Sequence, residues 1–438
     1  MKTLRFAIAA VAVVGSVSTF ATNARVESMG KNSTFIMDDI SIFDNPANIN
    51  LYPNFLIGEL GNYLYPTGTE PIPGENRDPL DPWFGGIFSL KVSADNSLSI
   101  AGVLNRKEER LLRFFPNYII NGAPAFDGDK GERAPVPATN FDGFVGANIG
   151  NKAFGVHIYL AHQDGLNGDG KISKDAFVSA LQLDLGTNIE ISNDYSIEIS
   201  GGGARMQYGP RDRKFLEMDL LSSFANIRMF SRINAINGHL IPVGSYRYMV
   251  APGREELDAG LGMGVDAAFD RGFFWLGLKG FYNNQRAGSN WRVIGDNGET
   301  VYTDDLTDDT WGAGSISRLW QFGGTISFGI EKNIWWDWFV LRVGGQKTIA
   351  YADYKAGAEP RSILCPNKAT SGCVSDGNYF VTNKTSDGTR DDNVGFGFGI
   401  NVEEKLKIDA TVAEDVVFRN PFQGEGRLIS RISASYSF

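Results

Sequence analysis

The sequence contains few of the side chains on which enzymes and nucleic-acid-binding proteins depend. Among 438 residues there are two cysteines and three histidines, His157, His162 and His239. So few histidines leave little for a zinc site or a histidine-based nucleophile, and no serine motif accompanies His162. The net charge of −10 lacks the basic excess that nucleic-acid binding requires. We predict a protein that is not an enzyme, needs no cofactor or metal ion and binds no nucleic acid.

Long apolar runs are also scarce. After the N-terminus no segment has the roughly 20 consecutive apolar residues that a membrane-spanning helix needs, and hydrophobic residues make up only 42 % of the chain. Glycine, with 52 residues, and aromatic residues, at 12 %, are frequent instead. This composition excludes a helical membrane protein. It fits a transmembrane β-barrel, in which only every second strand residue faces lipid.

Residues 1–24 have the pattern of a secretory signal peptide. Two basic residues precede an apolar stretch over 6–20, and cleavage is predicted after Ala21 or Ala24. The apolar stretch is too short to span a bilayer comfortably. No cysteine lies near the cleavage site, so the sequence does not predict a lipoprotein. The chain is therefore expected to be exported, with the bacterial outer membrane as its location.

The two cysteines lie close together in the chain. Cys365 and Cys373 are eight positions apart, in a segment rich in proline, asparagine, serine and glycine. In an oxidising exported compartment this spacing predicts a local disulfide that closes one loop. A metal or redox role is the weaker alternative, because no histidine or third cysteine is nearby.

From residue 54 onward, apolar residues repeatedly alternate with polar residues or glycine. In 393–404, for example, Val394, Phe396 and Phe398 alternate with asparagine and glycines. A strand points successive side chains to opposite faces, so this pattern predicts strands with one apolar and one polar face. The candidate strands are 54–65, 83–93, 97–105, 140–150, 153–161, 175–187, 195–208, 257–270, 272–284, 317–331, 337–351, 393–404, 406–416 and 427–438.

The connections between these strands alternate between long and short. Outer-membrane barrels have short periplasmic turns and longer outside loops. The alternation therefore predicts an all-β, fourteen-stranded antiparallel transmembrane barrel with both of its ends periplasmic. Acidic residues of the outside loops are expected to be solvated or to make weak divalent-ion contacts with lipopolysaccharide. The main predicted outside loops are 106–139, 209–256, 285–316 and 352–392.

Aromatic residues mark the end of the chain and one short turn. Tyr436 and Phe438 lie on the apolar face of the last candidate strand. This ending resembles the closing strand of bacterial outer-membrane barrels, which implies recognition by the barrel assembly machinery. The last strand of a secreted β-domain is the alternative. Trp335, Trp336 and Trp338 are predicted at the boundary between water and membrane lipid, with packing in a core as the alternative.

The predicted loop 209–256 contains a stripe of apolar residues at helical spacing. This stripe predicts an amphipathic helix over 215–233 on the outer rim. The helix would either pack over the mouth of the barrel, the interpretation we favour, or capture an apolar ligand. The stripe consists of Leu216, Leu220, Phe224, Ile227 and Phe230.

Several charged residues fall on strand faces that are predicted to line the lumen. They are expected to form ion pairs inside the barrel or to bind water, and some are expected to pair with residues 25–53. These residues are Asp258, Asp266, Arg342, Glu403, Lys407, Asp409 and Arg431.

Residues 25–53 show no strand pattern, and their proline and Asx residues favour turns. The segment resembles the start of the FadL-like outer-membrane transport family and its porin-V-type relatives, although Lys31 stands where relatives often have glycine. The resemblance implies a fourteen-stranded barrel whose N-terminal segment folds into the lumen as a hatch. The residues that carry it are Ala24-Arg25, Met29-Gly30, Asp38-Asp39 and Asn45-Pro46-Ala47.

The sequence therefore predicts a signal peptide (1–24), an N-terminal hatch (25–53) and a transmembrane barrel (54–438). The resemblance implies, as the expected function, passive uptake of small, hydrophobic molecules through a channel that the hatch gates. The alternative is an outer-membrane barrel that transports nothing and acts as an adaptor in secretion or attachment, or binds partners through its outside loops.

Overall fold

The structure is a computed structural model. Leu216, Cys365, Cys373 and the segment 1–22 lie outside the residues that it describes, so the predicted disulfide and signal peptide remain predictions. The described residues are 23–30, 33–60, 82–106, 108, 111, 139–166, 172–209, 219–251, 254–288, 293–294, 300–301, 316–355, 377–381, 393–403, 405–412 and 429–438.

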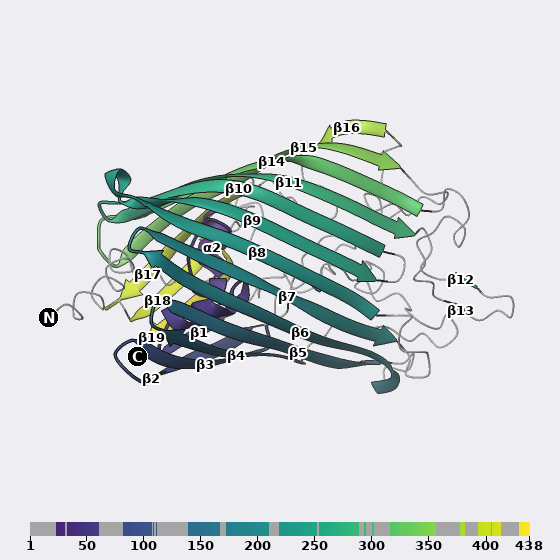
Figure 1. The fold of residues 1–438 in the computed structure, drawn as a ribbon, viewed down its shortest axis with the longest axis horizontal. Coiled ribbons are helices and arrows are strands. Elements are labelled where there is room, and N and C mark those ends of the chain that lie inside the picture. The colour runs from purple at the N-terminus through teal and green to yellow at the C-terminus, as the bar shows by residue number, and fades with distance from the viewer. Residues whose placement is uncertain are drawn as a thin grey trace.

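A closed antiparallel β-barrel forms the body of the molecule (Figure 1). The barrel closes because β1 pairs with β2 on one side and with β19 on the other. Of the seventeen strands in the sheet, β16 pairs only with one end of β15, whose other end pairs with β17. Sixteen strands therefore complete the ring.

The ring strands are β1 (Phe55–Glu59), β2 (Trp83–Lys91), β3 (Asn96–Leu104), β4 (Thr139–Ile149), β5 (Lys152–Leu166), β6 (Ile172–Ser192), β7 (Tyr195–Gly209), β8 (Asp219–Ile233), β9 (Gly238–Ala251), β10 (Arg254–Phe269), β11 (Gly272–Gly288), β14 (Ile316–Asn333), β15 (Phe339–Lys355), β17 (Asn393–Val402), β18 (Leu406–Val412) and β19 (Ile429–Ser437). Outside the ring lie β16 (Gly377–Val381), the two-stranded pair β12 (Val293–Ile294) and β13 (Thr300–Val301), and the short 3-10 helix η3 (Asn234–Ile236).

The prediction of a closed antiparallel barrel is confirmed, but the prediction of fourteen strands is wrong. The two further strands, β8 and β9, lie inside 209–256, which was predicted to be an outside loop. The predicted helix over 215–233 is wrong for the same reason. Leu220 and Phe230 are buried on the inward face of β8, while Leu221 and Ile227 are exposed on its outward face, beside Ser223 and Ala225. Because apolar residues occupy both faces, the period of two is hidden.

The outside of the barrel carries a belt of exposed apolar side chains. Leu261 of β10 is 77 % exposed and Leu278 of β11 is 57 % exposed. Their inward neighbours along each strand are glycine or polar residues, as the alternation predicted. Acyl chains, and not water, are the environment that suits such a belt. At the end where β19 finishes, Trp335, Trp336 and Trp338 are exposed in the turn between β14 and β15.

Within the described ranges, no helix combines the length and the apolar character needed to cross a bilayer.

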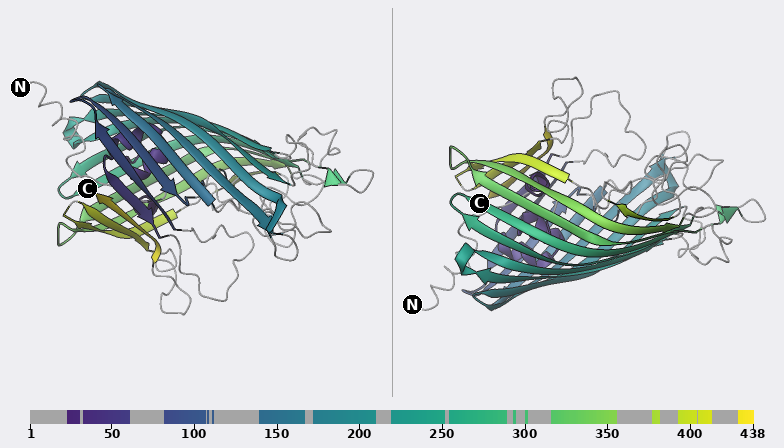
Figure 2. Two further views of the ribbon diagram at one scale, coloured as in Figure 1. Left: turned by 90° about the horizontal axis from the view of Figure 1, so that it is seen from below. Right: turned by 90° about the horizontal axis from the view of Figure 1, so that it is seen from above.

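The N-terminal segment, defined here as residues 23–54 without 31–32, contributes no strand and lies inside the barrel (Figure 2). It contains α2 (Asn23–Ser28) and the 3-10 helices η1 (Asp39–Phe43) and η2 (Pro46–Leu51). Asn45 begins η2, because its side-chain oxygen accepts a hydrogen bond from the Ala47 amide at 3.1 Å. Pro46 suits the first helical position, where no amide hydrogen is needed.

Two apolar clusters join this segment to the wall. In the first, the Phe43 ring meets Trp83 of β2 and Phe144 of β4 at centroid distances of 6.0 and 5.7 Å. In the second, the Phe35 ring lies 6.1 Å from that of Trp275 of β11. The apolar core of this protein therefore lies in the lumen, between the segment and the inner wall.

Candidate functional site

The inner wall is shaped to receive the N-terminal segment. The Phe35 ring lies directly against Gly264 of β10 and Gly277 of β11, and a Cβ atom at either glycine would overlap it. Two strands beyond β11 along the wall, Gly344 of β15 lies against the backbone of Met29. These glycines were predicted only as part of a polar strand face. Their absence of a side chain provides the space that the segment occupies.

The Asn45-Pro46-Ala47 motif docks on the opposite part of the wall. A Cβ atom at Gly155 of β5 or Gly186 of β6 would overlap this motif. The Asn45 amide also donates a 2.6 Å hydrogen bond to the Asn188 side chain of β6, which in turn donates one of 2.6 Å to Asn48. The motif therefore begins η2 and fixes it to the wall.

A buried ion-pair chain holds α2 to the barrel. Arg25 donates from Nε and Nη2 to the two carboxylate oxygens of Glu331 on β14, at 2.8 and 2.7 Å. Arg342 of β15 donates to the same carboxylate at 3.0 Å and to Asp409 of β18 at 2.6 Å. Each of these four side chains is at most 5 % exposed. Each charge is compensated by a partner, as burial requires.

Other polar contacts reach the segment from further strands. Arg228 of β8 donates to the carbonyl of Ile36 at 3.0 Å and pairs with Glu198 of β7. Arg431 of β19 lies 3.1 Å from Glu27 and 3.3 Å from Glu59 of β1. In addition, η2 contacts β3 to β6. The N-terminal segment therefore touches the barrel wall around most of the circumference of the barrel.

Asp38 and Asp39 lie at the centre of this arrangement. Both are fully buried, and neither carboxylate has a hydrogen-bond partner among the described residues. The Ser41 amide bonds to the Asp38 carbonyl at 3.0 Å, and its closeness to the Asp38 carboxyl group offsets only a small part of the effect of burial. Burial raises the pKa of Asp38 to about 7, against the attraction of Arg25. Burial, with repulsion from Asp38, raises the pKa of Asp39 well above its ordinary value.

The charged residues that were predicted to face the lumen lie in different environments. Arg342, Lys407 and Asp409 are buried in the interior near α2, and Arg431 also faces the segment. The other two that face inward are Asp258, which accepts from Asn283 at 3.3 Å, and Asp266, which lies 3.0 Å from His239 Nδ1. The prediction for Glu403 is wrong. Because β17 ends at Val402, Glu403 is exposed in the turn before β18.

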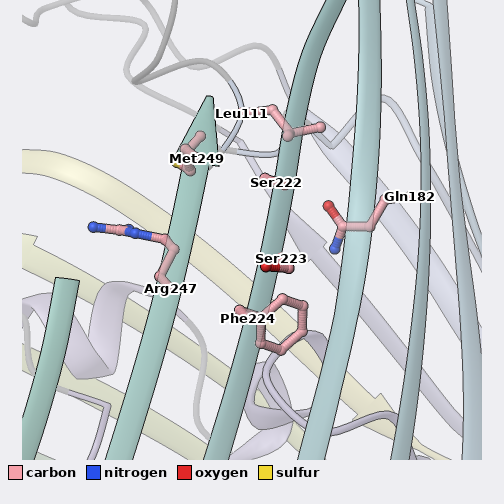
Figure 3. A pocket seen from close by; sticks show the side chains of 7 residues that line it. All are labelled: Leu111, Gln182, Ser222, Ser223, Phe224, Arg247 and Met249. Atoms are coloured by element: carbon pink, nitrogen blue, oxygen red, sulfur yellow. The ribbon is translucent and has the colours of Figure 1, made fainter. Parts of the chain in front are cut away.

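The predicted capture residues lie on both faces of β8. Phe224 faces the lumen with Leu220 and Phe230, whereas Ile227 is 49 % exposed on the outside. Phe224 also lines a pocket on the inner wall (Figure 3). Apolar side chains, among them Leu111 and Met249, and polar side chains, among them Gln182, line this pocket, and the Arg247 guanidinium points away from the other labelled residues. Its complete lining is Leu111, Gln182, Ser222, Ser223, Phe224, Arg247 and Met249.

Sequence reasoning missed a buried network centred on His157 of β5. The two ring nitrogens lie 2.8 Å from Asp184 of β6 and 2.9 Å from Asp142 of β4. Asp142 also accepts from Arg106, whose guanidinium lies 3.9 Å from the Phe43 ring centroid. The network thus supports the segment by a cation–π contact. Its only sequence signal was polar residues on the inward faces of three strands.

Metal binding finds no support in the part of the chain that the structure describes. No group of three or more His, Cys, Asp or Glu side chains there could hold a metal ion. The predictions of no metal, no cofactor and no enzymatic activity stay predictions.

The fold and interior together define a closed sixteen-stranded β-barrel whose lumen holds its own N-terminal segment. No family model matches the chain, and no curated protein matches it. Solved structures of β-barrels do match. The toluene transporter TodX of Pseudomonas putida is 9 % identical, with a TM-score of 0.39, over 96 % of this chain and 98 % of TodX.

Two further solved structures are similar in the same way. CdiB from Escherichia coli is 10 % identical with a TM-score of 0.40 over 88 % of this chain, which spans 62 % of the length of CdiB. OmpT of Vibrio cholerae is 9 % identical with a TM-score of 0.32, over 87 % of this chain and 96 % of OmpT. This similarity is confined to the barrel architecture.

Proposed function

We propose that this protein is an outer-membrane channel for passive entry of small, hydrophobic molecules, with the N-terminal segment as its hatch. The single observation that supports the proposal is the position of that segment, which lies inside the barrel and contacts the wall at β3 to β6, at β14 and β15, and at β17 to β19. A molecule that crosses the barrel must pass this segment, so the segment determines passage.

The surface of the barrel supports the location. Exposed apolar side chains such as Leu261 and Leu278 form the outer belt, and sixteen is an even strand number, as in bacterial single-chain barrels. Tyr436 and Phe438 stack at a centroid distance of 6.4 Å at the chain end, where the assembly machinery is proposed to read them. Membrane lipid and lipopolysaccharide would be the surroundings of this surface.

The inner wall supports a hydrophobic cargo. On the side of the segment away from the C-terminus, several inward-facing side chains are apolar, which a purely aqueous pore would not need. Phe224 and Met249 are the aromatic and thioether side chains that line the pocket. The apolar wall residues are Val178, Met206, Leu220, Met249 and Leu319, each at most 1 % exposed, so a cargo would reach them only where the packing around them opens.

Uptake into liposomes tests this function. Purified protein would be reconstituted into liposomes and exposed to a labelled aromatic hydrocarbon, with protein-free liposomes as the blank. We expect faster entry with protein than without it, and faster entry still after deletion of residues 23–52. Equal entry with and without protein would refute transport.

A barrel that transports nothing is the competing function, because an obstructed lumen also suits an adaptor. In that case the protein would co-purify with an exported partner and show no uptake. Uptake by the undeleted chain separates the two, because an adaptor would not speed hydrocarbon entry while its own N-terminal segment fills the lumen.

A further inference from the structure

The two adjacent acids of the N-terminal segment have no structural compensation for their burial. Asp38 and Asp39 are each 0 % exposed, and all four carboxylate oxygens are without hydrogen-bond partners among the described residues. An unpaired buried charge is costly, and a buried carboxyl group avoids that cost by keeping its proton. The docked segment therefore favours the neutral form of both side chains.

The surrounding charges do not remove this preference. Asp38 faces Arg25 of α2, Arg228 of β8 and the acidic Asp44. Both arginines already bond to a wall carboxylate, Arg25 to Glu331 and Arg228 to Glu198. These pairs leave little positive charge to stabilise a second carboxylate.

The environment of Asp39 favours a charged carboxylate no more than the environment of Asp38 does. It faces Arg25 and Lys407 as cations, and Asp38 and Asp409 as anions. Asp409 is bonded to Arg342, and the neutral Tyr52 is the remaining titratable group that Asp38 and Asp39 influence. Ionisation of both acids would place two like charges on neighbouring residues in a space without water-exposed surface.

We propose that proton binding by Asp38 and Asp39 controls whether the N-terminal segment stays docked in the barrel. With both carboxyl groups protonated the segment is docked, and ionisation favours its release into water. The inference rests on the proposed function in one respect only, which is that the released state is taken to be the open state of the channel. The docking equilibrium itself exists whether or not anything is transported.

The sign of the pH dependence follows from linkage. In the released segment both acids have their ordinary pKa, whereas burial raises the pKa of Asp38 to about 7 and that of Asp39 well above its ordinary value. The docked state thus binds more protons than the released state. Docking is strongest below about pH 4 and weakens as the pH rises through the pKa of the docked form.

Hydrogen exchange followed by mass spectrometry measures this docking directly. The amides of Ser41, Asn45, Asn48 and Tyr52 form hydrogen bonds within the segment and report its order. Protection factors would be measured in detergent micelles between pH 5 and pH 8, after correction for the intrinsic exchange rate. For the wild-type chain we expect protection of residues 38–52 to fall by about tenfold or more across this range.

Substitutions identify the groups responsible. In the double variant Asp38→Asn/Asp39→Asn, protection should no longer depend on pH and should remain high at pH 8. Asp44→Asn is the matched control, because Asp44 belongs to the same segment but is exposed. It should retain the wild-type fall in protection.

Two results would overturn the proposal: constant protection in the wild-type chain, or an unchanged fall in the double variant. The wild-type result is decisive even if the double variant fails to assemble. Hydrocarbon uptake measured at the same pH values separates the two proposals. Proton-linked docking without uptake refutes the channel alone, and uptake without proton-linked docking refutes only the present inference.

Discussion

Arg25 and Glu331 lie 306 positions apart in the chain, yet the Arg25 guanidinium donates two hydrogen bonds, of 2.8 and 2.7 Å, to the Glu331 carboxylate. The pair joins α2 of the N-terminal segment to β14 of the wall, and both side chains are buried. A two-point contact of this kind fixes orientation as well as distance. It is therefore the contact whose loss should most weaken the attachment of α2.

Replacing this arginine should loosen the segment. Arg25→Gln removes the positive charge, and breaking a buried ion pair typically costs about 3–5 kcal/mol. Because Arg342 continues to compensate Glu331, we expect a cost near the lower limit, about 3 kcal/mol. Single-channel recording in planar bilayers should show more frequent opening than for the wild-type chain.

Arg271→Gln is the control for that substitution. Arg271 pairs with Asp337 at 3.1 Å, but both side chains are mostly exposed to solvent, where ion pairs contribute little. Opening should match that of the wild-type chain. Identical recordings from Arg25→Gln and Arg271→Gln would contradict a role for Arg25 in holding the segment.

The close approach of Phe35 to the wall gives a second prediction. In Gly277→Ala the new methyl group would overlap the Phe35 ring, and overpacking of this kind typically costs about 1–3 kcal/mol. Gly280→Ala, on the outward face of the same strand, has no atom closer than 3.7 Å to its new Cβ. Hydrogen exchange of residues 33–43 should accelerate in the first variant only. Equal exchange in both would show that Phe35 does not depend on that space.

The architecture could be predicted largely from the sequence because lipid imposes a period of two on its strands. In strands such as β10 and β17, apolar residues alternate regularly with glycine and polar residues. The apolar side chains suit contact with acyl chains, whereas the glycine and polar positions face the N-terminal segment or water. The rule fails where the lumen is itself apolar. Leu220 and Phe230 of β8 pack inside the barrel, while Ile227 lies on its outward face. Because apolar residues thus occur on both faces, their spacing in the sequence resembles that of an amphipathic helix.

The candidate site could be predicted only in part. The turn-rich character of 25–53 and the motif at Asn45-Pro46-Ala47 indicated a separate segment. The sequence could not show which residues meet it, because Glu331 and Asn188 are close to the segment only after the barrel closes. The polar contacts of His157 were hidden for the same reason, since its partners come from two neighbouring strands.

The outer belt predicts how a charge on the lipid side would behave. Leu278→Arg places a cation on an exposed apolar position of β11, which costs about 2–4 kcal/mol near the middle of a bilayer. Leu278→Ile keeps the surface apolar and is the matched variant. The folded fraction should fall for arginine alone, measured as heat-modifiable mobility in electrophoresis after refolding into lipid vesicles. Equal folding of the two variants would contradict contact between this face and lipid.

The contacts of α2 discriminate between the two predicted cleavage sites. The Ala24 amide donates to Ser433 at 3.3 Å, its carbonyl accepts from Thr411 at 2.8 Å, and the Asn23 side chain donates to Glu59 at 2.8 Å. Cleavage after Ala24 would remove all three contacts and leave a charged amino group on Arg25, which is 1 % exposed.

Cleavage after Ala21 keeps every one of these contacts, so we expect the mature chain to begin at Thr22. Intact-mass spectrometry of protein purified from membranes would identify the first residue directly. Ala21→Leu should block processing at this site, whereas Ala24→Leu should still be cleaved after Ala21 and should dock poorly, because Ala24 is fully buried. A mature chain that begins at Arg25 would show that α2 is held by Arg25 and Ser28 without these upstream contacts.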